Sequence, residues 1–160
     1  MENIHGRFKP LTTFGILFFH AVAGYAVYRM FTTGYSTAAW ALLILMHILR
    51  TIGTTDGYHR FLTHGAFKAK PVFARAILGL GALQIQGGAD WEENHTQHHT
   101  RTDMPGDPHR PSEYGGGLWG LVWAHVGWTF FVVLPPLGYF KPAPSPEKAR
   151  LLEWQEHWYK

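Results

Sequence analysis

Two long apolar runs, separated by a short turn, dominate the first third of the chain. They cover residues 11–31 and 37–55, and Gly34 lies in the turn between them. Each run has close to the ~20 residues that a transmembrane helix needs, and neither shows the polar face of a surface helix in a soluble protein. The pattern therefore predicts a transmembrane helical hairpin; a hairpin buried in a soluble core is the alternative. His20 and His47 lie inside the runs, and we expect them to pack against neighbouring helices.

Basic residues lie on both outer sides of this hairpin. Arg7 and Lys9 precede the first run, Arg50 lies near the end of the second run and Arg60 follows it, whereas the turn has no Lys or Arg. Because positive charge favours the cytoplasmic side, both ends of the hairpin are predicted to be cytoplasmic, at a bacterial inner membrane or the endoplasmic reticulum. A cleavable signal peptide is not expected, because no small-residue cleavage pattern follows the first run.

Three later segments have helical character without the length of a clear span. Residues 72–86 are apolar but interrupted by glycine and glutamine, and residues 118–134 contain three tryptophans, which favour the headgroup zone of a membrane. We expect the first segment to be a helix that lies at the membrane interface or packs under the metal site, and the second to be an interfacial helix, with a third membrane span as the alternative. Ser145, followed by proline and glutamate, predicts the start of a short C-terminal helix. The chain is thus predicted to be an all-α integral membrane protein with a single domain, residues 1–160.

The polar segment of residues 56–110 carries the candidate chemistry. His95, His98 and His99 stand at i, i+3 and i+4, so on a helix they share one face. Imidazole nitrogen is a common ligand for zinc, iron and copper. The triplet therefore predicts half of a transition-metal site that faces water or a polar cavity, because charged residues flank it.

His59 and His64 form a second cluster about thirty residues earlier. They are five residues apart, which on an α-helix separates them by about 140° around the axis. Two ligands arranged in this way suit two metal ions, or a helix that ends near Gly65. An isolated pair at this spacing is weak evidence, but together with the triplet it indicates a histidine-rich metal site.

Composition limits the alternatives. The chain has no cysteine, so a metal must be held by histidine or oxygen, and eleven histidines are available. The net charge of +3 is modest. No stripe of Lys and Arg with stacking aromatic residues is present, so nucleic acid is not an expected partner.

The order of several motifs resembles that of the membrane-bound fatty-acid desaturases, closest to their delta-9, stearoyl-CoA-desaturase-like branch. The motifs are GYHRFLTH, WEENHTQHH, GDPHRP and WAHVGW, and the resemblance covers residues 50–128. Membrane hydroxylases and carotenoid ketolases share histidine boxes, but the last two motifs favour the desaturases. A related histidine-box hydroxylase is kept as an alternative.

The resemblance implies an O2-dependent di-iron enzyme on the cytosolic face of the membrane. Its substrate would be an acyl chain on coenzyme A, a lipid or acyl-carrier protein, and its product a cis alkene. Cytochrome b5 or a ferredoxin would supply two electrons. The implied iron ligands are His59, His64, His95, His98 and His99. The other implied site residues are Trp91, which would line the acyl tunnel, Asp103, Asp107 and His109, which would orient ligands or order a loop, and His125, with a structural or orienting role.

Two features depart from the family pattern. Members need a third histidine box after a further pair of spans, and this sequence has only His157 after His125. We therefore expect a truncated fragment without independent activity. In addition, Glu92 and Glu93 stand where acyl-CoA enzymes tend to place a basic residue, and they would repel a phosphate. An acyl-lipid or acyl-carrier-protein substrate thus stays open beside acyl-CoA.

Two alternatives from other classes also involve metal. A non-catalytic membrane protein could hold zinc or haem through the same histidines, because zinc needs only four ligands. That hypothesis leaves GDPHRP and WAHVGW unexplained. A soluble zinc hydrolase is disfavoured, because the triplet lacks the glutamate base of the H-E-x-x-H motif.

Overall fold

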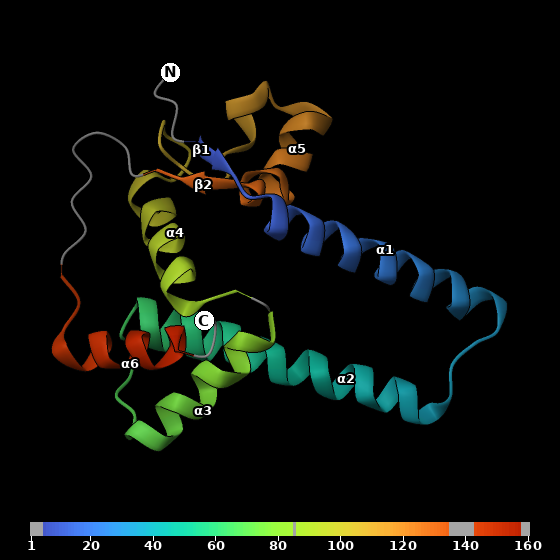
Figure 1. Ribbon diagram of the computed structural model, residues 1–160, viewed down its shortest axis with the longest axis horizontal. Coiled ribbons are helices and arrows are strands. Elements are labelled where there is room, and N and C mark those ends of the chain that lie inside the picture. The colour runs from blue at the N-terminus through green and yellow to red at the C-terminus, as the bar shows by residue number, and fades with distance from the viewer. Residues whose placement is uncertain (1–4, 85, 135–142, 158–160) are drawn as a thin grey trace. The chain divides into compact units, whose positions relative to one another are not determined.

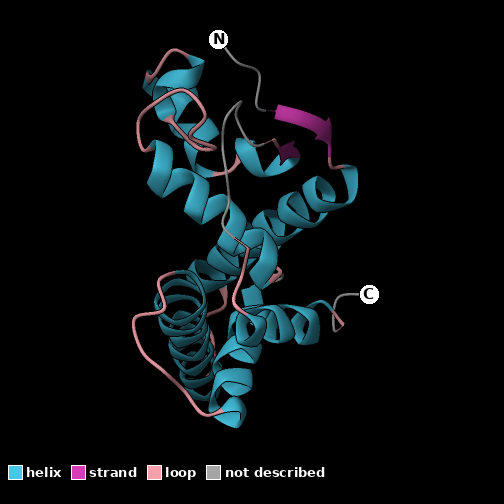
Figure 2. Cartoon of the chain, turned by 90° about the vertical axis from the view of Figure 1, so that its left-hand side faces the viewer, coloured by secondary structure: helices cyan, strands magenta, loops and turns pink. Residues whose placement is uncertain are grey.

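The computed structural model describes residues 5–84, 86–134 and 143–157, and these are mainly helical (Figure 1). In chain order the elements are β1 (His5–Phe8), α1 (Pro10–Thr32), α2 (Thr37–Ile52), the π-helix η1 (Gly53–Thr63), α3 (Pro71–Gly81), the 3-10 helix η2 (Ala82–Gln84), α4 (Gly88–Arg101), the 3-10 helix η3 (Pro111–Tyr114), α5 (Gly117–His125), the 3-10 helix η4 (Gly127–Phe130), β2 (Phe131–Val133) and α6 (Pro146–Glu156). Helices predominate in Figure 2, and among the described residues β1 and β2 form a two-stranded sheet. The all-α prediction is therefore confirmed.

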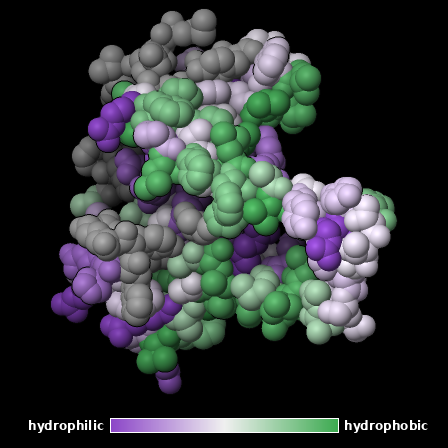
Figure 3. All heavy atoms as spheres, turned by 45° about the vertical axis from the view of Figure 1, so that its right-hand side comes forward, coloured by the Kyte–Doolittle hydropathy of each residue, from purple (hydrophilic) through white to green (hydrophobic). Residues whose placement is uncertain are grey.

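Helices α1 and α2 expose many apolar side chains, as membrane-spanning helices do. α1 and the continuous helix of residues 37–63 are each long and apolar enough to cross a membrane, and at most 6% of either apolar window is buried. A core helix of a soluble protein would be covered by the rest of its chain, whereas neither α1 nor α2 has a buried residue. Apolar side chains are accordingly prominent on the outside in the space-filling view (Figure 3). These features fit the predicted membrane protein.

The chain divides into two compact units, and α4 contributes residues to both. Unit 1 is drawn from Met1–Ala39 and Gln97–Tyr139, and unit 2 from Trp40–Thr96 and Phe140–Lys160. Each unit therefore combines an early segment with a late one.

In unit 2, η1 and α3 pack closely because glycine lines their contact. A Cβ on Gly53 would lie 2.2 Å from the backbone nitrogen of Gly81, and a Cβ on Gly57 would lie 2.7 Å from the Ile77 carbonyl oxygen. Position 53 thus meets 81 and position 57 meets 77, so the two helices run antiparallel. The small core beside them consists of Tyr58, Leu62, Ala74, Leu78 and Leu151.

In unit 1, a two-stranded antiparallel ribbon fastens the start of the chain to a late segment. Phe8 of β1 pairs with Phe131 of β2, and their rings lie 5.8 Å apart. The Lys9 backbone N–H then donates to the Phe130 carbonyl at 2.7 Å, immediately before α1 begins at Pro10. Proline suits this first helical position because its missing N–H would have no partner there.

The single helix expected over residues 118–134 is interrupted. Helix α5 ends at His125, where Val126 has φ −143°, and a 3-10 turn and strand β2 follow. Residues 129–133 read TFFVV, and β-branched and aromatic residues favour a strand over a helix. Pairing with β1 satisfies the strand's backbone and so overrides the apolar pattern that suggested one helix.

Candidate metal centre

The π-helix η1 brings His59 and His64 together in unit 2. A π-helix closes each turn with a bond between residues i and i+5, and the His64 backbone N–H donates to the His59 carbonyl at 3.0 Å. Residues five apart therefore lie nearly above one another, and the two rings are 4.6 Å apart between centroids. The separation of about 140° expected from α-helical geometry was wrong, because this segment is not α-helical.

His95 of α4 completes a group of three imidazoles in unit 2. Its ring centroid lies 4.8 Å from that of His59 and 5.6 Å from that of His64. If one ring nitrogen is taken from each of the three histidines, the three nitrogens lie within 4.8 Å of one another. The two histidine clusters predicted from the sequence thus meet in space.

Trp91 lies one helical turn before His95 and stacks against it. The two rings are 5.4 Å apart and inclined by 21°, and Trp91 also approaches Tyr58 at 6.1 Å. Its indole nitrogen is buried and has no hydrogen-bond partner among the described residues. Trp91 therefore forms an apolar wall beside His95 and packs against the unit 2 core.

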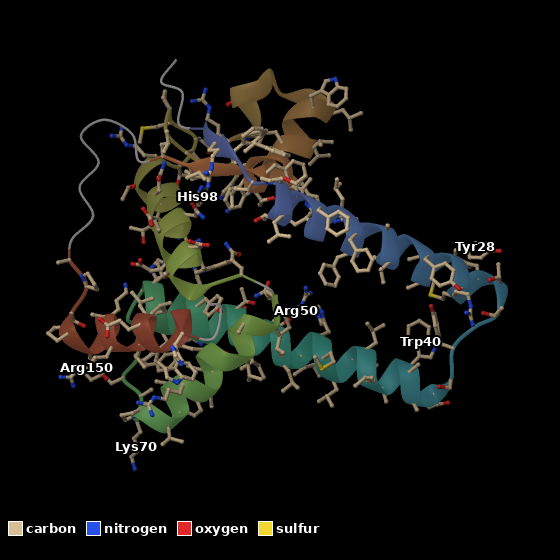
Figure 4. The ribbon with its side chains drawn as sticks, viewed as in Figure 1. Tyr28, Trp40, Arg50, Lys70, His98 and Arg150 are labelled. Carbon is tan, nitrogen blue, oxygen red and sulfur yellow. The ribbon has the colours of Figure 1, made fainter. Side chains whose placement is uncertain are left out.

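In unit 1, the carboxylate of Asp107 fixes one nitrogen of His98. The His98 Nδ1 lies 3.0 Å from the Asp107 Oδ1, and the Asp107 side chain is almost fully buried. Figure 4 shows His98 projecting from α4. A carboxylate next to Nδ1 favours the histidine tautomer that carries its proton on Nδ1. The Nε2 of that tautomer has no proton and can accept a metal ion.

Two backbone N–H groups hold the Asp107 carboxylate in place. Asp103 donates to Oδ2 at 3.0 Å, and His109 donates to Oδ1 at 3.2 Å. Asp103 has φ 58°, a left-handed conformation that asparagine and aspartate tolerate better than most residues. The loop after α4 is therefore shaped around Asp107, and Asp103 contributes its backbone N–H to that arrangement.

The His109 ring stacks on His98 with 4.2 Å between centroids and also contacts Trp128 at 5.4 Å. Burial lowers the pKa of His109, and the neighbouring His98 lowers that pKa further, while Asp107 acts in the opposite direction. His109 is therefore neutral near pH 7, so it adds no positive charge beside His98.

The two remaining candidates lie on α4 and α5. His99 follows His95 by one turn of α4 and so shares its face. His125 ends α5, and the ring contact found for it is with His20 of α1, at 6.4 Å. The structure thus groups His59, His64 and His95 in unit 2, groups His98, Asp107 and His109 in unit 1, and pairs His125 with His20.

The acidic pair before His95 does not present two charges to solvent. Glu92 is 4% exposed and its Oε1 lies 2.7 Å from the Lys148 Nζ of α6, whereas Glu93 is exposed. The repulsion of a phosphate that the sequence suggested therefore rests on Glu93. No sequence signal reveals the partner of Glu92, because Lys148 lies 56 residues away.

The donors in unit 2 fit a transition metal. Metal–imidazole bonds of about 2.0–2.1 Å separate opposite ligand nitrogens by about 4.2 Å. The nitrogens of His59, His64 and His95 lie within 4.8 Å, so side-chain shifts below one ångström would bring them into range. With no cysteine in the sequence, such a site has nitrogen and oxygen donors only, which suit iron or zinc.

Comparison with curated proteins finds similar chains. Hex-5-enoyl-(acyl-carrier protein) acetylenase of Moorena producens is 37% identical over 120 residues, which make up 71% of this chain and 37% of that protein. An sn-2 palmitoyl-lipid 9-desaturase of Nostoc sp. is 36% identical over 128 residues, 78% of this chain and 40% of that protein. An acyl-CoA Delta(11) desaturase of Choristoneura rosaceana is 34% identical over 125 residues, 76% of this chain and 34% of that protein.

The chain therefore spans about a third of the length of these relatives. No family model matches the chain, and no solved structure matches it.

Proposed function

Because this chain belongs to the fatty-acid desaturase family, we propose that it forms part of an O2-dependent acyl desaturase with a di-iron site. The reaction would remove two hydrogens from adjacent methylenes and leave a cis double bond, at the delta-9 position. In the balanced reaction one O2 is reduced to two waters. It takes up the two hydrogens of the acyl chain, two electrons from a donor protein and two protons. The proposal concerns the polypeptide that contains this chain.

The observation that carries the proposal is the meeting of His59, His64 and His95 in unit 2. These residues come from the two histidine motifs of the sequence, and they converge beside an apolar wall formed by Trp91. Unactivated C–H bonds are beyond acid–base side chains, and bound iron with O2 would supply the oxidising power. An apolar wall next to the donors suits an acyl chain as the substrate.

We propose that the iron ligands within this chain are His59, His64, His95, His98 and His99. Asp107 would orient His98 by keeping the proton on Nδ1, so that Nε2 faces the metal. Asp103 and His109 would fix Asp107 through their backbone N–H groups. Trp91 would line the path of the acyl chain and keep water from the reacting carbons.

The acyl carrier is proposed to be a lipid, acyl-carrier protein or coenzyme A. The names of the relatives include all three carriers. Exposed Glu93 disfavours a phosphate next to α4. We further propose that α1 and α2 cross the bilayer, that the metal site is cytoplasmic, and that cytochrome b5 or a ferredoxin supplies the electrons.

The test is product formation by the polypeptide that contains this chain, purified from membranes with its bound metal measured. About two irons per chain and O2-dependent formation of a cis alkene are expected. His98→Ala should abolish the alkene, since it removes a proposed ligand. His47→Ala, in α2 and outside both histidine groups, is the matched control and should keep its iron.

Full product formation by His98→Ala would refute the ligand assignment. One zinc per chain, with no O2-dependent turnover when a reductant is supplied, would refute the enzyme and favour a non-catalytic metal protein. The position of the double bond in the product tests the delta-9 proposal separately.

A further inference from the structure

One face of α5 is apolar and uncovered. Leu118, Leu121, Val122 and His125 stand at i, i+3, i+4 and i+7, so they form a stripe along the helix. The three apolar members are 71%, 63% and 43% exposed. The opposite side is covered: Gly120 and Trp123 are buried, and a Cβ on Gly120 would lie 2.3 Å from the Pro111 carbonyl. The stripe therefore lies on the side of α5 that turns away from Pro111.

The C-terminal end of this stripe, at His125, contacts α1. The His125 ring contacts His20 edge-on at 6.4 Å, and the His20 Nδ1 leans back to the Ile16 carbonyl at 2.8 Å. Ile16 is six residues into α1, which corresponds to about 9 Å along the helix. Contacts between η4 and α1, and the bond from Lys9 to Phe130, fix the following turn beside the start of α1 (Figure 1).

We infer that α5 lies within the hydrocarbon of the cytosolic leaflet, with its exposed stripe against lipid chains. This goes beyond the helix at the membrane interface expected from the sequence, and it rests on the proposed crossing of the bilayer by α1. A depth of about 9 Å is nearly a third of a hydrocarbon core of about 30 Å. With nine residues, α5 is too short to cross the membrane itself.

Charge and backbone pairing both support lipid as the occupant. The sequence has no charged residue between Glu113 and Lys141, so no ion would be drawn into the hydrocarbon with α5. Backbone polar groups must be paired there. Val126 N–H donates to the Val122 carbonyl at 3.0 Å, Thr129 N–H donates to the Val126 carbonyl at 3.1 Å, and β2 pairs with β1. Helix α1, which His125 contacts through His20, also exposes apolar side chains such as Leu17 and Phe18.

A protein partner would be expected to leave a different signature. Protein interfaces surround their apolar centre with a polar rim, whereas the residues next to the stripe in α5 are glycine, alanine and tryptophan. Trp119, 75% exposed, suits the boundary between headgroups and hydrocarbon, where an indole ring is buried and its N–H stays wet.

Single nitroxide labels test the inference, because residues 1–160 contain no cysteine and any cysteine elsewhere in the polypeptide is first replaced by serine. The polypeptide that contains this chain is reconstituted in phosphatidylcholine vesicles with Leu121→Cys or, as a second site on the stripe, Leu118→Cys. Leu11→Cys and Phe18→Cys mark the start of α1 and a deeper position, and Arg150→Cys in α6 marks water. Collisions of each label with O2, which dissolves in lipid, and with a Ni(II) chelate, which stays in water, are then compared.

The expected result is an O2-to-nickel collision ratio at Leu121 above that at Leu11 and far above that at Arg150. A ratio at Leu121 equal to that at Arg150 would overturn the inference, as would protection from both reagents, which indicates a covering protein. A ratio at Leu121 below that at Leu11 would place α5 in the headgroup zone, and this result would also overturn the inference. If the label at Phe18 is also exposed to water, the proposed crossing of the membrane by α1 is refuted as well. If only the labels at Leu118 and Leu121 are exposed to water, the proposal for α1 stands and the inference for α5 is refuted.

Discussion

Asp107 accepts three hydrogen bonds, from the His98 ring and from the backbone N–H groups of Asp103 and His109. A buried carboxylate with this many donors is held in one orientation. Its effect on the proposed metal site would therefore be indirect: it fixes the ring and the tautomer of His98. Asp103 has a different role, because its contribution is a backbone group.

Replacing Asp107 by Asn should weaken metal binding by roughly 10–100-fold, the usual effect of removing a carboxylate that orients a histidine ligand. The neutral amide cannot hold the proton on Nδ1 as strongly and brings its own N–H groups into the loop. Competition with a chelator, for cobalt as a spectroscopic probe and then for iron, measures the affinity.

Asp103→Asn is the matched control, because Asn tolerates φ 58° and leaves the backbone N–H in place. Its metal affinity should stay within about twofold of the unmodified protein. An equal loss in both variants would mean that the charge of the whole loop matters, and that Asp107 has no specific role toward His98.

Residue types and spacings pointed to the histidines of α4 and η1, and the structure brings His59, His64 and His95 together. The i, i+3, i+4 spacing did not show that His98 lies with Asp107 and His109 instead of with His95. The partner of Glu92 could not be predicted, because Lys148 comes from a distant helix and only tertiary packing brings them together. The pairing of His125 with His20 was missed for the same reason.

At the scale of single elements, η1 depends on its neighbour α3. The sequence left open a helix that ends near Gly65, but residue types do not specify whether the backbone bonds of such a helix close at i+4 or i+5. Tyr58 of η1 packs fully buried against α3, and a Cβ on Gly81 would lie 2.5 Å from its ring. A one-residue change of register would move both Tyr58 and His59, so the π-helical form and the position of the His59 ring are linked.

Gly53→Ala should destabilise unit 2 by roughly 1–3 kcal/mol, the usual cost of forcing an extra methyl group into a packed contact. The methyl group would overlap the backbone at Leu80 and Gly81, and backbone cannot rotate away. Thermal unfolding in detergent, followed by circular dichroism, measures the change.

The matched control is Gly79→Ala in α3, where a Cβ would meet nothing within 4 Å. Alanine favours a helix more than glycine does, so this variant should be stabilised by up to about 1 kcal/mol. Equal destabilisation by both substitutions would contradict the close packing of η1 on α3.

At the scale of the whole molecule, each unit is closed by a late segment of the chain. In unit 2 that segment is α6, whose Leu151 enters the core and whose Lys148 pairs with buried Glu92. Removing one member of a buried ion pair leaves a charge without compensation, whereas removing both can cost little.

Lys148→Met should therefore destabilise the protein by roughly 2–3 kcal/mol, somewhat below the cost for a fully buried pair because Lys148 keeps partial exposure. The double variant Glu92→Gln with Lys148→Met should recover most of this loss. Arg60→Met, which breaks an exposed pair with Asp56, is the control and should cost about 1 kcal/mol or less. No recovery in the double variant would mean that Lys148 acts through its packing and not through its charge.

The ribbon of β1 and β2 has a consequence for the time course of biosynthesis. Phe8 pairs with Phe131, so 123 residues must be translated after the first strand before its partner exists. At about 5–20 residues per second, the first strand waits roughly 6–25 s. During that interval α1 is already available to the translocon, while the edge of β1 has no partner strand from its own chain. A ribosome that stalls within this window would therefore expose a nascent chain whose first strand is open to chaperones.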